Sequence, residues 1–335
     1  MSNETHSPDA LGDLVTGILV RHNTSDANAR SVADALIAAQ IDGHAGHGLS
    51  RVASYAAQAK SGKVDGHARP AALDAGRAAI RIDAANGFAF PALDLARQTI
   101  LQRIADTGII AAGITRSHHL GAAGRHVELL AQNGLIGLIM GNSPKAIAPW
   151  GGKEGVFGTN PIAFAAPRRG DEAPLLIDLS LSKVARGKIM VASKSGDPIP
   201  EGWALDSDGN PTTDAKAALG GTMIPMGDAK GAALVLMVEI LAAALTGANF
   251  GYEATSFFDA EGAPPGVGQT LIAIDPDGLS GSAFAQRLED LIGAILAQSG
   301  TRLPGTRRLE NRKKAAANGI SVPAALMQEL TDLAG

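Results

Sequence analysis

Two histidines, an aspartate and an arginine fall within one ten-residue stretch, DGHAGHGLSR at 42–51. An imidazole titrates near neutral pH, so His47 could shuttle a proton, and a guanidinium such as Arg51 can hold a carboxylate with two parallel hydrogen bonds. The stretch follows a predicted helix, so the alternative is that these side chains cap its last carbonyl groups. Its three glycines favour a ligand site, because glycine lets a ligand approach the backbone closely.

A second cluster, RSHHLGAAG at 116–124, lies between a predicted strand and a predicted helix. Its small residues leave the amides at the start of that helix open, which suits an anion or a phosphate. Together with His44 and His47, the pair His118-His119 could also ligate a metal. Catalytic zinc sites usually recruit well-separated ligands, and the H-E-x-x-H spacing is absent, so we expect no metal site.

Two later stretches are also rich in polar groups. The stretch 142–161 contains NSP, APWGG and GTNP, which predict a loop between strands that either binds a ligand or simply turns the chain. The stretch 178–188, DLSLSKVARGK, is a strand that ends in hydroxyl groups, followed by a basic helix start. Arg186 and Lys188 oppose the helix dipole there, so they indicate either a bound anion or a solvated charged face.

The common nucleotide-binding motifs are absent. The glycine-rich stretches 43–48 and 262–268 do not have the G-x-G-x-x-G spacing of a Rossmann fold. Residues 227–231, GDAKG, lack the leading glycine and the Ser/Thr of a P-loop. A phosphate must therefore be bound by another arrangement.

Hydrophobic periodicity predicts an N-terminal hairpin of two helices at 8–23 and 25–41, the second capped by Ser25. The elements predicted after it are helices at 91–107, 122–133, 183–192, 229–246, 283–298 and 323–333, and strands at 109–114, 135–141, 161–166, 174–179 and 270–274. Helical ends flank a mixed middle, so we expect an α/β fold. Its helical subdomain is 1–77 plus 281–335, and its mixed-sheet subdomain is 78–280.

Bulk properties exclude several classes of protein. The net charge of -4 offers no field for nucleic acid, and the absence of cysteine excludes disulfides and Cys-ligated zinc. The opening MSNETHSPDA lacks the basic and apolar regions of a secretory signal. The apolar stretch 231–245 contains Glu239 and is shorter than the about 20 residues that cross a membrane. We therefore predict a cytoplasmic protein with neither a nucleic-acid nor a membrane partner.

Taken together, the motifs resemble the malate/L-lactate dehydrogenase family, which also contains ureidoglycolate and sulfolactate dehydrogenases and the piperideine- and pyrroline-2-carboxylate reductases. The resemblance covers nearly the whole chain. It rests on GHAGHGLSR, SHHLGAAG, NSPKAIAPWGG, FGTNPIAFAAP, IDLSLSKVARGK, PIPEGWALDSDGNPTTD and KGAALVLMVEILAAALTG. The resemblance implies the non-Rossmann fold of nicotinamide-dependent sulfolactate and malate dehydrogenases, NAD or NADP as cofactor, and a homodimer.

The same resemblance implies roles for individual residues. His47 corresponds to the proton donor or acceptor, and His119 lies where some members place their proton acceptor, so the choice between them stays open. The implied substrate contacts are Arg51, Thr159, Arg186, Gly187 and, by its charge, Lys188. The implied cofactor contacts are His119, Leu120, Gly121, Ala122, Ala123, Ser143, Asp178, Leu179, Ser180, Lys230 and the loop Gly305, Thr306, Arg307 and Arg308.

The chain departs from this family pattern at three positions. The ketimine reductases have a relay serine before the catalytic histidine and a relay aspartate after the pair that matches Arg186-Gly187; here these are Gly46 and Lys188. The usual Gly-Gly before Lys-Gly is Gly227-Asp228. Arg51, Arg186 and Lys188 would place three cations around a small substrate, which suits a dianion. We therefore predict interconversion of a 2-hydroxy acid and a 2-oxo acid of malate or sulfolactate type, with cyclic ketimine reduction as the alternative.

Overall fold

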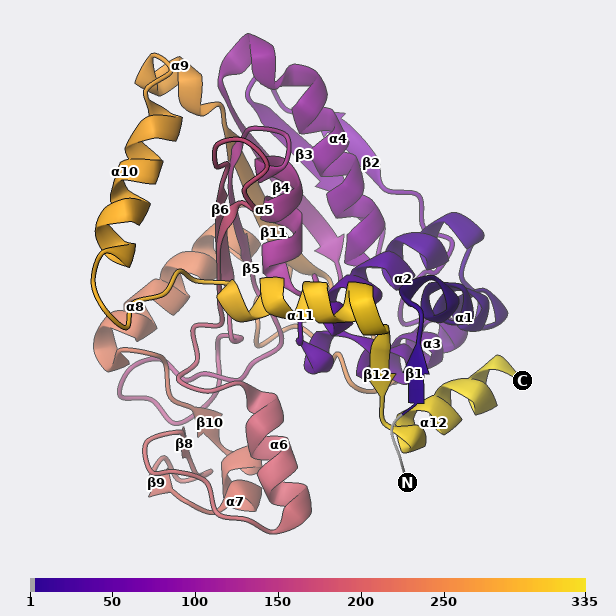
Figure 1. Cartoon of the computed structure of the whole chain (residues 1–335). Helices are drawn as coiled ribbons and strands as arrows, with labels where there is room; N and C mark the ends of the chain where they lie inside the picture. The colour runs from indigo at the N-terminus through magenta and orange to yellow at the C-terminus, as the bar shows by residue number, and fades with distance from the viewer. Residues whose placement is uncertain (1–3) are drawn as a thin grey trace.

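The computed structural model describes residues 4–335 and has a seven-stranded mixed sheet at its centre (Figure 1). The strand order is β2-β3-β4-β11-β5-β6-β7; β3 and β4 run parallel, and the other neighbours are antiparallel. The strands are β2 (Ala71–Asp74), β3 (Ala79–Asp83), β4 (Ile109–Ser117), β5 (Ile136–Gly141), β6 (Ile162–Ala166), β7 (Leu175–Leu179) and β11 (Val267–Ile274). The predicted α/β fold with a mixed sheet is confirmed.

Both faces of this sheet are covered, as strand β11 illustrates. Its Leu271 belongs to the core between the sheet and helices α4 (Ala89–Thr107) and α5 (Ala123–Ala131). The next residue, Ile272, packs instead against the core that contains Val235 and Val238 of α8 (Asp228–Glu239). Successive side chains of a strand point to opposite faces, so a strand buried on both sides carries the near-continuous apolar sequence seen here.

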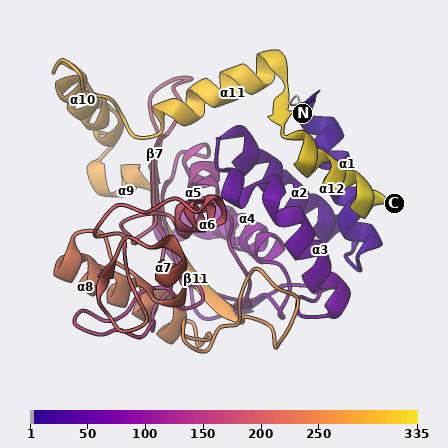
Figure 2. The same cartoon turned by 90° about the horizontal axis from the view of Figure 1, so that it is seen from below.

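The two ends of the chain pack together beside the sheet (Figures 1 and 2). The predicted helical hairpin is present as α1 (Pro8–Arg21) and α2 (Asp26–Ile41), and the Ser25 hydroxyl caps α2 by accepting from the Asn28 N–H. Strand β1 (Glu4–His6) pairs with β12 (Ile320–Val322), and α3 (Val52–Ser61) and α12 (Ala324–Ala334) complete this helical layer. Leu11, Leu36, Leu330 and other apolar side chains from both ends share one core.

The remaining elements are a small lobe, the continuation of α8 and three helices near the end of the chain. A smaller lobe projects from the sheet (Figure 1) and contains α6 (Arg186–Ser195), α7 (Ala215–Gly220) and the sheet β10-β8-β9, whose strands are β8 (Ala204–Leu205), β9 (Pro211–Thr212) and β10 (Thr222–Met223). Helix α8 continues into a π-helical turn, η3 (Ile240–Ala244). The chain then runs through α9 (Pro276–Ser280), α10 (Phe284–Leu296) and α11 (Thr306–Asn318).

Three predicted boundaries are wrong. The helix expected at 183–192 begins only at Arg186, because the Lys183 N–H donates to the Ile224 carbonyl at 2.8 Å and keeps this part of the chain extended. The α-helix expected at 229–246 ends at Glu239, where the π-helical turn begins. The expected loop Gly305–Arg308 is the start of α11, with Gly305 at the N-cap in the left-handed conformation (φ 83°).

The division into residues 1–77 plus 281–335 and residues 78–280 stays a prediction. Phe88 and Phe90, from the second range, belong to the core shared by the chain ends. Residues 1–3 belong to the segment for which we predicted no secretory signal, and they lie outside the described residues. Among residues 4–335, the structure has no helix long and apolar enough to span a membrane.

Candidate active site

The structure brings His47 and His119 together although 72 residues separate them in the chain. His47 lies in the short 3-10 helix η1 (Ala45–His47), and His119 follows β4. Their rings stack, with centroids 5.1 Å apart and planes 15° from parallel. Gly48 allows this turn, because a Cβ at this position would lie 2.4 Å from the Gln40 side-chain oxygen, which accepts from the Leu49 N–H.

His119 sits on a buried polar and aromatic layer that the sequence motifs do not reveal. The Tyr55 hydroxyl lies 2.6 Å from Nδ1 of His119, and Nε2 of the adjacent His118 lies 2.7 Å from Oε1 of Gln58. Phe257 packs against both histidine rings, at 5.1 and 5.2 Å between centroids. The one available signal for Tyr55 is its spacing of four residues from Arg51, which puts the two side chains on one face of a helix.

Burial keeps these imidazoles neutral. It lowers the pKa of His47 from 6.5 to about 4, with smaller contributions from the charges of Arg51 and His44. Burial and the Arg51 charge lower the pKa of His118 to about 3 and that of His119 well below its ordinary value. At neutral pH each ring therefore has one nitrogen that donates and one that accepts a hydrogen bond.

Arg51 presents a guanidinium that is only partly used by the protein. Its Nε donates to the Gly46 carbonyl at 2.7 Å, and its central carbon lies 4.4 Å from the centroid of the Phe258 ring. Its Nη1 is buried without a hydrogen-bond partner among the described residues. A buried donor without a partner costs about 1–3 kcal/mol, so this atom fits a ligand anion such as a carboxylate.

The loop that carries Phe257 and Phe258 is fixed to α3 and to the residues that directly follow it. Lys63 donates to Oδ1 of Asp259 at 2.9 Å and to the Ser256 carbonyl at 2.8 Å, and Gln58 donates to the Phe257 carbonyl at 2.9 Å. The Lys63 side chain has no exposed area. The aromatic wall of the site is therefore set by contacts between the N-terminal helices and a loop about 200 residues later in the sequence.

The predicted cofactor contacts around α5 lie side by side. Leu120 to Ala123 form the turn into α5, with Gly121 in the left-handed conformation (φ 71°), and Oδ2 of Asp178 at the end of β7 accepts from the Gly124 N–H at 2.8 Å. Burial raises the pKa of Asp178. A Cβ on Gly124 would lie 2.9 Å from Oδ2, so this close contact requires glycine.

Four other predicted contacts, Ser143, Thr159, Ser180 and Lys230, lie along one series of hydrogen-bonded segments. The Thr159 N–H donates to the Ser143 hydroxyl at 3.1 Å, and the Thr159 carbonyl accepts from the Leu181 N–H at 2.9 Å, next to Ser180. The Leu181 carbonyl accepts from the Met226 N–H, just before α8, whose first turn carries the exposed Lys230. Asp228 has a positive φ of 56°, which fits the glycine that the family pattern places here.

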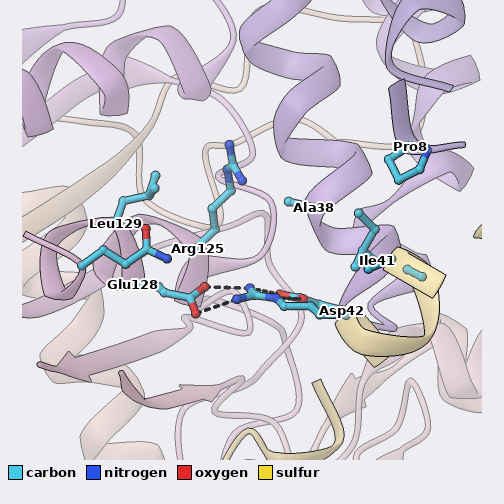
Figure 3. Close-up of a pocket in the computed structure, with 11 residues that line it drawn as sticks. Pro8, Ala38, Ile41, Asp42, Arg125, Glu128 and Leu129 are labelled. Atoms are coloured by element: carbon cyan, nitrogen blue, oxygen red, sulfur yellow. Dashed lines mark hydrogen bonds and ion pairs between the residues drawn. The ribbon is translucent and has the colours of Figure 1, made fainter. Parts of the chain in front are cut away.

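The start of α11 is held by ion pairs rather than by an apolar face. Arg308 pairs with Glu128 of α5 at 2.9 Å, and Arg312 bridges Glu128 and Asp42, with closest distances of 2.7 and 2.6 Å. Figure 3 shows Glu128 and Asp42 facing one another beside a pocket of about 420 Å³ between α2, α5 and α11. His47 and His119 do not line this pocket. The bridge links the end of α2, which leads to His47, to the predicted cofactor contacts Gly305–Arg308.

Replacing Arg312 with glutamine is expected to lower the free energy of unfolding by about 2 kcal/mol. The change leaves two poorly exposed carboxylates without their shared cation, although Arg308 still pairs with Glu128; one broken buried pair costs about 3–5 kcal/mol. Urea denaturation followed by circular dichroism measures this loss. Replacement of the exposed Arg302 is the control, and a loss under about 0.5 kcal/mol for Arg312→Gln would mean that the bridge contributes no stability.

Arg186, Gly187 and Lys188 lie in the first turn of α6, which belongs to the small lobe (Figures 1 and 2). Arg186 donates to the Leu219 carbonyl at 3.4 Å, and Lys188 is exposed. No described interaction joins them to His47 or Arg51. Within residues 4–335, no group of three or more His, Asp or Glu side chains has the arrangement of a metal site.

Residues 6–331 match the family described as malate/L-lactate dehydrogenase. The chain belongs to this family. It is 51% identical over 302 residues to a (2R)-3-sulfolactate dehydrogenase (NADP(+)) of Chromohalobacter salexigens, with 90% of each chain covered. It is 42% identical to a Δ1-pyrroline-2-carboxylate/Δ1-piperideine-2-carboxylate reductase of Pseudomonas syringae pv. tomato, with 99% of this chain and 97% of the relative covered.

A solved structure agrees with this membership. The crystal structure of Δ1-piperideine-2-carboxylate reductase from Pseudomonas syringae superposes with a TM-score of 0.93 at 41% identity, covering 98% of this chain and 99% of the other. The predicted family, its non-Rossmann fold and the prediction of an NAD(P)-dependent oxidoreductase are therefore confirmed. The roles of individual residues stay predictions.

Proposed function

We propose that the chain is an NADP-dependent dehydrogenase that interconverts 3-sulfolactate and its 2-oxo acid, or a closely related dianionic pair. One observation carries this proposal: the neutral imidazole of His47 lies beside Arg51, whose Nη1 is buried and unpaired. A base and a carboxylate clamp are the two groups that a 2-hydroxy acid needs. The relative at 51% identity that is named for sulfolactate and NADP(+) supports the choice of substrate and cofactor.

Substrate binding and proton transfer are assigned to different residues. Arg51 would hold the carboxylate through its free Nη1, while the Phe258 ring covers the guanidinium. His47 would accept the hydroxyl proton in the oxidation and return it in the reduction. The nicotinamide cofactor, when bound, supplies or accepts the hydride.

The residues fit a phosphate-bearing cofactor. The helices α5, α8 and α11 begin at the predicted cofactor contacts, and their first N–H groups favour anions. The exposed side chains of Lys230 and Arg307 add two cations. These groups would hold the phosphates, and Asp178 holds the start of α5 in place through the Gly124 N–H.

The second acidic group of the substrate distinguishes the two candidate reactions. Arg186 and Lys188 in the first turn of α6 supply cations that a sulfonate or a second carboxylate could pair with, whereas a cyclic imino acid carries only one carboxylate. Ketimine reduction remains the alternative, since a relative at 42% identity carries that name. Gly46 and Lys188, which replace both relay residues of those reductases, argue against it.

A homodimer in the cytoplasm is part of the same proposal. Leu236, Met237, Ile240 and Leu245 of α8 and its extension are each more than 40% exposed. An exposed apolar patch of this kind is typical of an interface between subunits. The absence of cysteine suits a reducing compartment.

The proposal is tested by following oxidation of NADPH and NADH at about 340 nm, the wavelength at which reduced nicotinamides absorb, with sulfopyruvate, oxaloacetate, pyruvate and piperideine-2-carboxylate. The highest kcat/KM is expected with a dianion, because up to three cations are then paired. The highest kcat/KM with the cyclic imine would overturn the proposed function in favour of the alternative.

A paired substitution tests the substrate reasoning independently. Gly46→Ser combined with Lys188→Asp introduces both relay residues of the ketimine reductases. A Cβ at Gly46 meets no atom within 4 Å, so the serine fits. The double variant is expected to lose at least about tenfold in kcat/KM on a dianion, since one charged contact is worth about 1.5–3 kcal/mol. Pyruvate, with one carboxylate, is the control substrate; an equal loss on both would exclude Lys188 from recognition of the second acid.

A further inference from the structure

Tyr55 makes one hydrogen bond among the described residues, and it is to the second histidine of the site. The phenol oxygen lies 2.6 Å from Nδ1 of His119; the tyrosine side chain has no exposed area, and His119 is 8% exposed. The rings of Phe88, Phe90 and Phe257 surround this pair. Within residues 4–335, the phenol makes no second hydrogen bond.

Which of the two groups donates this hydrogen bond follows from the protons that the phenol and the imidazole carry. If Nδ1 of His119 donated, the phenol proton would be buried without an acceptor, at a cost of about 1–3 kcal/mol. If the phenol donates, its proton and the Nδ1 lone pair are both satisfied. Burial raises the pKa of Tyr55, so the phenol keeps its proton. His119 is then the tautomer that carries its proton on Nε2.

The two stacked histidines therefore differ in what they can do. Nδ1 of His119 is occupied by Tyr55, and Nε2, which carries the proton, can only donate to a ligand. His47 has no such partner: its Nδ1 is buried without a hydrogen bond, and no described residue engages its Nε2. His47 is thus free to exchange a proton.

We infer that Tyr55 is a positioning residue that fixes His119 as a neutral hydrogen-bond donor, which leaves proton exchange to His47. Under the proposed function, on which this assignment of roles rests, His119 donates to the substrate oxygen that changes between hydroxyl and carbonyl. A donor aimed at an oxygen that gains negative charge stabilises the transition state, and removal of one such donor costs about 10²–10³ in kcat.

The tautomer is tested without reference to activity. In the protein labelled with ¹⁵N-histidine, long-range proton–nitrogen spectra at neutral pH distinguish a protonated Nε2 from a protonated Nδ1. His119 is expected to be protonated on Nε2, and in Tyr55→Phe it should become a mixture of tautomers. His118 is the internal reference, because Gln58 rather than Tyr55 fixes its Nε2 proton. A proton on Nδ1 of His119 in the wild-type protein would overturn the inference.

Two substitutions of His119 separate a donor from a base. The amide nitrogen of glutamine can occupy the position of Nε2 and still donate, whereas asparagine reaches only the position of Nδ1. His119→Gln is expected to keep kcat within about tenfold of the wild type, and His119→Asn to lose about a hundredfold or more. If His119 were the base, both would lose activity to the same extent, and that result would overturn the assigned role.

Tyr55→Phe tests whether the phenol acts through His119. It should lower kcat about tenfold and change the substrate KM less than threefold, and it should have no further effect when combined with His119→Gln, which needs no tautomer lock. Additive effects in the double variant would overturn the inference. If the tautomer is as stated but no 2-oxo acid reacts, the proposed function fails while the role of Tyr55 in fixing the tautomer stands.

Discussion

Replacing His47 with alanine is expected to lower kcat for the best 2-oxo acid about a hundredfold or more. General acid–base catalysis by a positioned side chain contributes about 10²–10⁴ to the rate. The ring nitrogens of His47 are not engaged by described residues, whereas Nδ1 of His119 is held by the Tyr55 hydroxyl, so His119 is not expected to take over the proton exchange. Steady-state kinetics in both directions, together with the Kd of NADPH by fluorescence titration, separate lost chemistry from lost cofactor binding.

The control for this variant is His44→Ala. His44 is exposed and lies three residues before His47. Of the three causes that lower the pKa of His47, the charge of His44 is the smallest. Its replacement should change kcat less than threefold. A full rate in His47→Ala would transfer the proton exchange to His119 and would contradict the separation of roles between the two histidines.

Local sequence patterns predicted the parts of this site whose signals are local. DGHAGHGLSR and SHHLGAAG carry the polar residues and the glycines of their own turns, so the sequence alone was enough to select His47, Arg51 and His119. The family resemblance implied a role for each of them, and the structure adds the stacking of the two histidine rings. The strands β4 and β5 and the helices α1, α2 and α4 were predictable because each has a continuous apolar periodicity.

The layer beneath His119 could not be predicted in the same way. Tyr55 and His119 are 64 positions apart, and Gln58 and Phe257 are 199 positions apart, so no spacing in the sequence brings them together. Helix α11 was missed for a different reason: its sequence TRRLENRKKAAAN has no apolar stripe, and ion pairs to Glu128 and Asp42 hold it instead. Strands β2 and β3 are short: Ile80 and Ile82 of β3 alternate with polar residues, but over only five residues, which is a weak signal.

Acid is expected to destabilise the protein strongly between pH 6.5 and 5. Four histidines, His47, His118, His119 and His126, have pKa values lowered mainly by burial, to about 4 for His47 and His126 and about 3 for His118. In the unfolded chain they titrate near 6.5. The unfolded state therefore binds up to about four more protons, so stability is fully present above pH 6.5 and is lost as the pH falls toward the folded-state values.

The expected loss is about 6 kcal/mol between pH 6.5 and 5, since each of the four neutral buried histidines contributes about 1.5 kcal/mol over that interval. The raised pKa of Asp178 acts in the opposite direction. Carboxylates with lowered pKa values, such as Asp83, add their own loss only below about pH 4. Urea denaturation at fixed protein concentration measures the free energy of unfolding at each pH.

Two variants test the origin of this acid sensitivity. His126→Gln removes one of the four groups, a histidine that packs on Phe90 and donates from Nε2 to the Leu120 carbonyl. The slope of unfolding free energy against pH should then fall by about a quarter, whatever the loss at pH 8. His67→Gln, on the surface, should leave the slope unchanged. A wild-type slope near zero between pH 6.5 and 5 would mean that these histidines titrate in the folded protein as they do in the unfolded chain. His47 and His119 would then lose, at mildly acidic pH, the neutral imidazoles that their proposed roles require.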